Sequence, residues 1–223
     1  MTNIGEDGAQ QMAKRDAVFD VDTIKTGQRD FVCAMPLSAT QWGRVMMKLT
    51  QACLESLQSF VVSGQDDCEK NFGDSFLSVI AQSIRNFPNL KILSLTGCNI
   101  RVEGVRALSS VLHFFTRLQS IDLSGNPLDD DAGVVLSSGL AKLRVFQDSF
   151  KVLKLKGTAL GNIGVAAISA CVSDKLRNIE QLDFTGATLT PAVEEDLTGT
   201  WTALPNLKQM PIKSKKAYTQ VQP

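Results

Sequence analysis

The amino-acid sequence predicts one α/β solenoid, in which each coil consists of a short strand followed by a helix. Two observations predict this architecture. An eight-residue segment, with apolar residues at places one, four and six and glycine at place eight, occurs five times along the chain. Between these segments, apolar residues recur at three- and four-residue spacing, which is typical of a helix with one buried side. We therefore expect stacked coils whose parallel strands form one sheet.

The five segments define the strands. They begin at Leu57, Leu90, Leu118, Phe150 and Ile179, so successive starts are 33, 28, 32 and 29 residues apart. Side chains alternate across a strand, so places four and six are expected to face the core while places three, five and seven face outward. The glycine at place eight indicates a tight strand exit. A sixth copy at residues 207–214 keeps the apolar places without the glycine, as expected of a terminal coil.

Beyond the glycine, the match continues for three more places. Place eleven is apolar in the four later copies, and place nine is occupied by Cys98, Asn126, Thr158 and Ala187. The pattern resembles the leucine-rich-repeat consensus LxxLxLxxN/CxL, and a strand plus a full helix in 28 to 29 residues resembles its ribonuclease-inhibitor-like type. The resemblance implies a short horseshoe with concave strands, convex helices and protein partners. Asn or Cys at place nine can hydrogen-bond to backbone groups of the adjacent coil. Because Thr158 and Ala187 occupy this place in the later coils, we expect weaker hydrogen bonding between those coils.

The helices are expected around residues 105–112, 133–140 and 164–172. Two helix starts carry local signals. Asp129–Asp131 places negative charge where it complements the helix dipole, and Thr190 precedes Pro191, a favoured first helical residue. The acidic cluster also suggests metal or phosphoryl chemistry, but we expect it to cap the helix.

The chain divides into four predicted regions. Residues 1–30 form a flexible arm, 31–56 a cap, 57–214 the repeats and 215–223 a basic tail. Within the cap we expect a strand at 30–34 and a helix at 38–54, which is either a structural cap or a docking helix for a partner. The apolar side of this helix comprises Trp42, Val45, Met46, Leu49 and Cys53.

Composition excludes several classes of protein. Lysine and arginine number 23, as do aspartate and glutamate, so the formal net charge is zero and no overall field draws the chain to nucleic acid or membranes. No apolar run approaches the roughly 20 residues that span a bilayer, and the first residues lack a signal-peptide pattern. The five cysteines form no CxxC pair, which argues against zinc and secreted disulfide frameworks. We expect a cytoplasmic protein with reduced, mostly buried thiols.

Candidate catalytic groups are few. His113 is the only histidine and is expected on the surface of a convex helix, without a companion for metal binding. The sequence has no GxxxxGK[ST] loop for nucleotide phosphates. We therefore expect no catalytic residue, cofactor, metal ion or small-molecule substrate.

Partner binding is expected at the outward places of the strands, which are free to vary on a concave face. Lys154 and Lys156 occupy outward places and, with Lys151 nearby, form a local group of basic residues between acidic neighbours. This alternation fits internal ion pairs of about 0.2 to 1 kcal/mol each, or a charge pattern that fixes the register of a partner. The insertion at 142–148 adds Phe146, as a partner anchor or a core residue. The candidate concave residues are Ser94, Asp122, Lys151, Lys154, Lys156, Glu180 and Asp183.

Three functions fit the sequence. The first is a non-catalytic protein-interaction scaffold or structural subunit of a larger assembly, cytoskeletal or axonemal, for example. The second is a GTPase activator similar to those for Ran, with Asn99 and Arg101 in a suitable loop; stimulated GTP hydrolysis would test it, although the basic tail differs from the acidic tail of that family. The third is a nucleic-acid-associated subunit, which we do not expect and which salt-insensitive binding would exclude. Because the outward places lack aromatic residues, edges, caps and convex helices are alternative surfaces.

Overall fold

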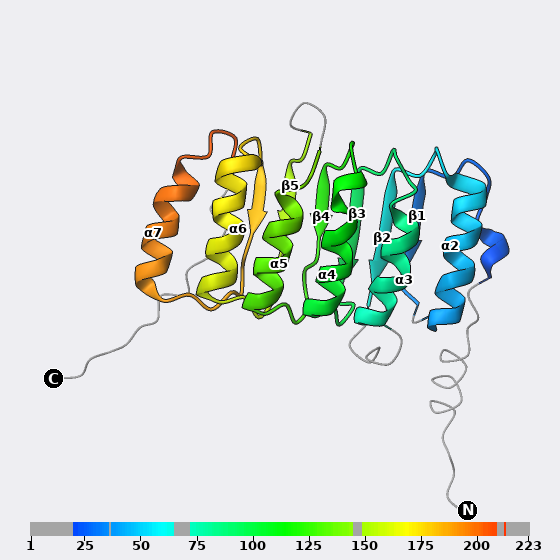
Figure 1. Ribbon diagram of the computed structural model, residues 1–223, viewed down its shortest axis with the longest axis horizontal. Coiled ribbons are helices and arrows are strands. Elements are labelled where there is room, and N and C mark those ends of the chain that lie inside the picture. The colour runs from blue at the N-terminus through cyan, green and yellow to red at the C-terminus, as the bar shows by residue number, and fades with distance from the viewer. Residues whose placement is uncertain (1–19, 36, 65–71, 145–148, 209–211, 213–223) are drawn as a thin grey trace, which may run out of the picture.

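The computed structural model describes residues 20–35, 37–64, 72–144, 149–208 and 212. Strands and helices alternate along this part of the chain (Figure 1). The strands are β1 (Asp30–Cys33), β2 (Ser59–Ser63), β3 (Ile92–Thr96), β4 (Ser120–Asp122), β5 (Val152–Lys154) and β6 (Gln181–Asp183). The helices are α2 (Ala39–Cys53), α3 (Asp74–Ile84), α4 (Val102–Val111), α5 (Asp130–Leu140), α6 (Asn162–Lys175) and α7 (Pro191–Thr202), with short 3-10 helices η1 (Val21–Thr23) and η2 (Leu112–Phe114).

The strands form one parallel sheet in the order β1 to β6, and this confirms the predicted α/β leucine-rich-repeat solenoid. Equivalent places of successive segments lie opposite one another, for example Ser94 with Asp122 and Asp122 with Lys154. The backbone N–H at place two of each coil donates to the place-two carbonyl of the coil before it. The sixth copy follows the same rule, since Lys208 N donates to Glu180 O at 3.0 Å.

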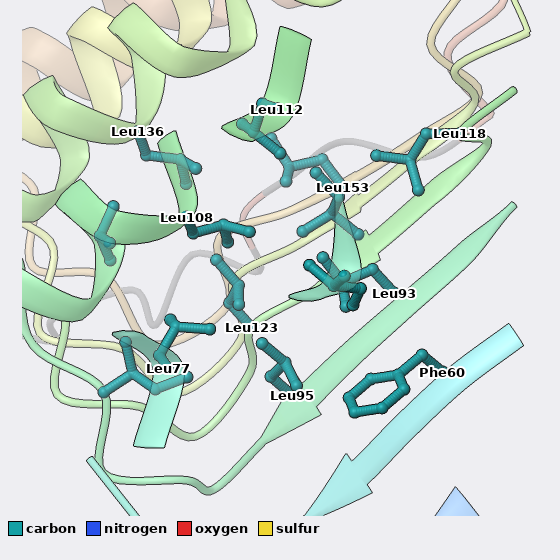
Figure 2. Packing of buried hydrophobic residues seen from close by; sticks show 14 of the residues in the cluster. Phe60, Leu77, Leu93, Leu95, Leu108, Leu112, Leu118, Leu123, Leu136 and Leu153 are labelled. Atoms are coloured by element: carbon teal, nitrogen blue, oxygen red, sulfur yellow. The ribbon is translucent and has the colours of Figure 1, made fainter. Parts of the chain in front are cut away.

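The core lies between the sheet and the helices, which cover one face of it (Figure 1). Figure 2 shows Leu93, Leu123 and Leu153 from the strand side of successive coils facing Leu108 and Leu136 from α4 and α5. All five side chains are 0% exposed, as places four and six and the helix pattern predict. Burying a leucine side chain is worth about 1.5 to 3 kcal/mol, so this continuous apolar layer holds the coils together.

The strand exits depend on glycine for two different reasons. Gly97, Gly125, Gly157 and Gly186 have φ values of +60°, +71°, +67° and +102°, a conformation that glycine adopts most readily. At Gly64 the reason is space, because an added Cβ would lie 1.9 Å from the carbonyl oxygen of Gly97. The predicted tight exits are therefore confirmed.

Helix starts are capped within a coil or from the preceding coil. Asp129 caps α5 by accepting from Ala132 N at 2.9 Å. Asp130 Oδ1 instead accepts from Gly161 N and Gly164 N, at 2.7 and 2.8 Å, and so caps α6 of the next coil. The predicted capping role of this acidic cluster is thus confirmed. Thr190 precedes α7 as predicted, but its side chain makes no capping hydrogen bond.

The buried asparagine at place nine links two coils as predicted. Asn126 Oδ1 accepts from Cys98 N and Ile100 N, at 2.9 and 3.0 Å. Its Nδ2 donates to Leu95 O and Leu123 O, at 2.7 and 2.8 Å. At the same place in the next coil, the side chain of Thr158 donates only to a carbonyl of its own coil, at 2.8 Å. At place nine, the side-chain hydrogen bonding between coils that Asn126 provides is therefore not continued by Thr158.

The first coil is closed by an aromatic cluster. Helix α2 begins with a capping box at Ser38, and its predicted apolar side is fully buried. Trp42 contacts Phe31, Phe60 and Phe76, with ring centroids 4.9 to 6.4 Å apart. Ile24 is 4% exposed and belongs to the buried core. The folded part of the chain therefore begins within residues 1–30, the region predicted to be a flexible arm. The other domain boundaries stay predictions.

None of the helices in the described ranges is both long enough and apolar enough to cross a membrane.

Candidate functional site

The open face of the sheet is the candidate binding surface, because the helices cover only the opposite face (Figure 1). The place-five residues of all six strands lie in one row across this face. Strand pairing aligns them in the order Val32, Val61, Ser94, Asp122, Lys154 and Asp183. The structure therefore brings four of the predicted site residues, Ser94 to Asp183, side by side.

The charged part of this row is oriented by the backbone. Asp122 Oδ1 accepts from Ser124 N at 3.0 Å, and Asp183 Oδ1 accepts from Thr185 N at 2.9 Å. These bonds hold one carboxylate on each side of Lys154. Within the described ranges, none of the three charged groups of the row forms an ion pair within 4.0 Å. Their side chains are partly exposed on the open face, where a partner can contact the alternating charges.

Lys151 and Glu180 are arranged differently, because they pair with each other. Lys151 Nζ lies 3.4 Å from Glu180 Oε1, and Lys208 Nζ bonds to the other carboxylate oxygen. The hydrogen bond from Lys208, and the charges of both lysines, hold the pKa of Glu180 below its ordinary value. For these two predicted residues, internal ion pairing is the arrangement observed.

Replacing Glu180 with glutamine is expected to remove a small acid-dependent part of the stability. A lowered folded-state pKa stabilises the fold above the unfolded pKa, near 4.5, and this stabilisation is lost as the pH falls through the folded value. The wild-type protein should therefore lose more stability than Glu180→Gln between pH 6 and about pH 3. Urea unfolding across this range measures the difference. Glu195→Gln, an exposed change on α7, is the control; equal pH dependence of all three proteins would contradict the ion pairs.

The two other predicted residues are Lys156 and Phe146. Lys156 is exposed at the exit of β5, next to Gly157. Phe146 lies outside the described residues, so its role as an anchor stays a prediction.

An apolar area at the other end of the face was not predicted from the sequence. Val32 is 66% exposed and Ile92 is 42% exposed, and the partly exposed Val61 lies opposite Val32 in the sheet. Val32 could have been found by extending the place-five row into the strand predicted at 30–34. Ile92 could have been found by examining place three as well as places five and seven. The open face thus has an apolar end at β1 to β3 and a charged end at β4 to β6.

The candidate chemical groups are dispersed. Half-buried His113 contacts the ring of Phe114, and the described residues contain no group of three His, Cys, Asp or Glu that could hold a metal ion. Asn99 has a left-handed φ of 49° in the loop after β3, and Arg101 is exposed at the start of α4. Burial raises the pKa of the Cys171 thiol to about 11, which suppresses the reactive thiolate near neutral pH.

Comparison with known proteins agrees with this geometry. A family model described as "Leucine Rich repeat" matches residues 88–109 and 116–137. A solved structure titled "Leiomodin-1 Actin-Binding Site 2 (ABS2)" has a TM-score of 0.51 and 13% identity, covering 60% of this chain and 78% of that one. The tropomodulin C-terminal domain of Caenorhabditis elegans has a TM-score of 0.51 and 11% identity, covering 73% of this chain and 90% of that one. At these identities the likeness shows the fold.

Proposed function

Because this chain is a leucine-rich-repeat protein, we propose that it is a non-catalytic protein-interaction module and that its partner binds the open face of the sheet. The observation that carries the proposal is the place-five row, in which Asp122, Lys154 and Asp183 alternate in charge without pairing among the described residues. Beside them, exposed valine and isoleucine side chains offer apolar surface, and burying this surface against a partner would stabilise the complex. Charge thus sets the register of the partner, and apolar contact adds affinity.

We propose further that the module is a scaffold or structural subunit of a cytoskeletal assembly in the cytoplasm. The support for this finer assignment is the fold shared with leiomodin and tropomodulin domains, the first of which is titled as an actin-binding site. Co-sedimentation with filamentous actin is the first test. If the protein stays in the supernatant at all actin concentrations, direct actin binding fails while the protein-interaction role stands.

Exchanging two charges of the row is expected to weaken partner binding at least about tenfold. The double variant Lys154→Glu/Asp183→Lys keeps the net charge but places like charges against a partner matched to the original order. Affinity purification from cells, followed by quantitative mass spectrometry of the retained proteins, measures the loss. The result identifies the partner as the protein that the wild type retains and the double variant releases.

The matched control exchanges two exposed charges away from the row. Arg44→Glu/Glu195→Lys changes the same charge types on α2 and α7, and it should retain the partner. Equal retention by both double variants would contradict binding through the charged row. Equal loss in both would also contradict it, because the effect would then not depend on the open face.

A further inference from the structure

Charged side chains are unevenly divided between the two edges of the described solenoid. We define the start edge as the loops that lead from each helix to the next strand, at residues 54–58, 85–91, 112–119, 141–144, 149–151 and 176–180. These loops lie along the upper edge in Figure 1. The opposite edge, where strands lead into helices, carries mostly acids: Asp74, Glu103, Asp129, Asp130, Asp131 and Glu194. A chain of zero formal net charge is therefore electrically asymmetric.

Basic residues dominate the start edge, and most of them are not neutralised. Lys151 pairs with Glu180, as described above. Five exposed basic residues of this edge form no ion pair with any described residue: Arg85, Arg117, Lys142, Arg144 and Arg177. They come from four adjacent coils, so their positive charges reinforce one another along the edge.

Stabilisation of the helices explains only part of this arrangement. A cation favours a helix dipole only within about the last turn. Arg85 is the C-cap residue of α3 and meets this condition, but the last turns of α4 and α5 contain no basic residue. Arg117, Arg144 and Arg177 lie in loops beyond the helix ends. Repulsion between neighbouring coils works against folding, so a partner of opposite charge is the better account of these residues.

An exposed aromatic side chain lies within this positive edge. Phe114 is 44% exposed, the guanidinium carbon of Arg85 lies 5.9 Å from its ring centroid, and the His113 ring centroid lies 4.0 Å away. Aromatic residues, including phenylalanine, and arginine are enriched at protein interfaces. The edge thus combines an apolar anchor with surrounding positive charge.

Hydrogen bonds between coils hold the start edge in shape. Asn89 Nδ2 donates to Glu55 O at 2.7 Å, and Ser149 Oγ donates to Leu118 O at 3.3 Å. Asn206 Nδ2 donates to Asn178 Oδ1 at 3.0 Å. A surface held in this way loses less conformational entropy when it binds a partner.

We propose that the start edge binds an acidic polypeptide segment, whose carboxylates pair with the arginines and whose apolar side chain contacts Phe114. This inference rests on the proposed function and adds the chemistry of a partner and a second surface. A polypeptide fits better than single-stranded nucleic acid, which binds through successive stacked bases. Among the described residues, Phe114 is the sole large aromatic side chain that is exposed.

The test uses the full-length chain and a fluorescent peptide of glutamate and alanine with one central leucine. Fluorescence anisotropy at low salt should show binding that Arg117→Glu/Arg144→Glu weakens at least about tenfold. Phe114→Ala should weaken it about fivefold or more. The control Arg44→Glu/Arg101→Glu makes the same change in net charge at exposed sites away from the start edge, and it should bind within about twofold of the wild type. Circular dichroism confirms that each variant is folded.

Three results would overturn the inference. They are no binding of the peptide, an equal loss in both double variants, or tighter binding of single-stranded polyuridine than of the peptide at the same salt concentration. The last would make the start edge a nucleic-acid surface. The proposed function fails separately, when the charge exchange at Lys154 and Asp183 leaves partner retention unchanged.

Discussion

Replacing Asn126 with leucine is expected to destabilise the protein by about 4 kcal/mol or more. The side chain is 0% exposed and hydrogen-bonds to five backbone groups of two adjacent coils. Leucine has a similar size but leaves those backbone groups unpaired, and each buried unpaired group costs about 1 to 3 kcal/mol. Urea unfolding followed by far-ultraviolet circular dichroism measures the change.

Thr158→Val is the matched control for this prediction, because it alters the same place in the next coil. It removes one hydrogen bond, from Thr158 Oγ1 to Leu155 O, so we expect a loss of only about 1 kcal/mol. If Asn126→Leu costs no more than Thr158→Val, the asparagine does not link the coils as its hydrogen bonds indicate.

Replacing Trp42 with alanine is expected to cost about 3 to 5 kcal/mol, the usual range for removing a large buried aromatic side chain. Trp42 is 0% exposed and contacts the rings of Phe31, Phe60 and Phe76. The cavity would open the first coil, which has a neighbouring coil on one side only within the described sheet. Hydrogen exchange should therefore increase in β1 and α2 more than in α6, and urea unfolding gives the total loss.

Trp42→Phe separates packing from hydrogen bonding at this site. The indole N–H of Trp42 is buried without a hydrogen-bond partner among the described residues, so its removal breaks no hydrogen bond. Phenylalanine keeps most of the ring contacts, and we expect a loss of roughly 1 kcal/mol. A loss as large as that of Trp42→Ala would contradict the assignment of the effect to aromatic packing.

Local patterns in the sequence predict most of this fold because each coil repeats the same strand and helix with the same apolar spacing. Apolar alternation gives β2 to β6, and the buried side of α2 follows from spacing alone. Capping between coils could not be predicted in this way. Asp130 is 31 residues from Gly161 and 34 from Gly164, so only the stacking of coils brings them together.

The candidate site could be predicted only in part. Register alone places Asp122, Lys154 and Asp183 in one row, because equivalent places of parallel strands align. The pattern could not show that Lys151 pairs with Glu180, since side-chain geometry decides between an internal and an external partner. The start edge was missed for a different reason. Its arginines lie in loops outside the repeated segments, where no periodicity draws attention to them.

Cross-linking mass spectrometry of the protein bound to its natural partner tests the central claim most directly. Amine-reactive reagents join lysines that lie close together in a complex. If the partner occupies the charged end of the open face, Lys154 and Lys156 should form cross-links to it. Cross-links confined to Lys14, Lys25 or the C-terminal lysines 213, 215 and 216 would contradict binding at the open face.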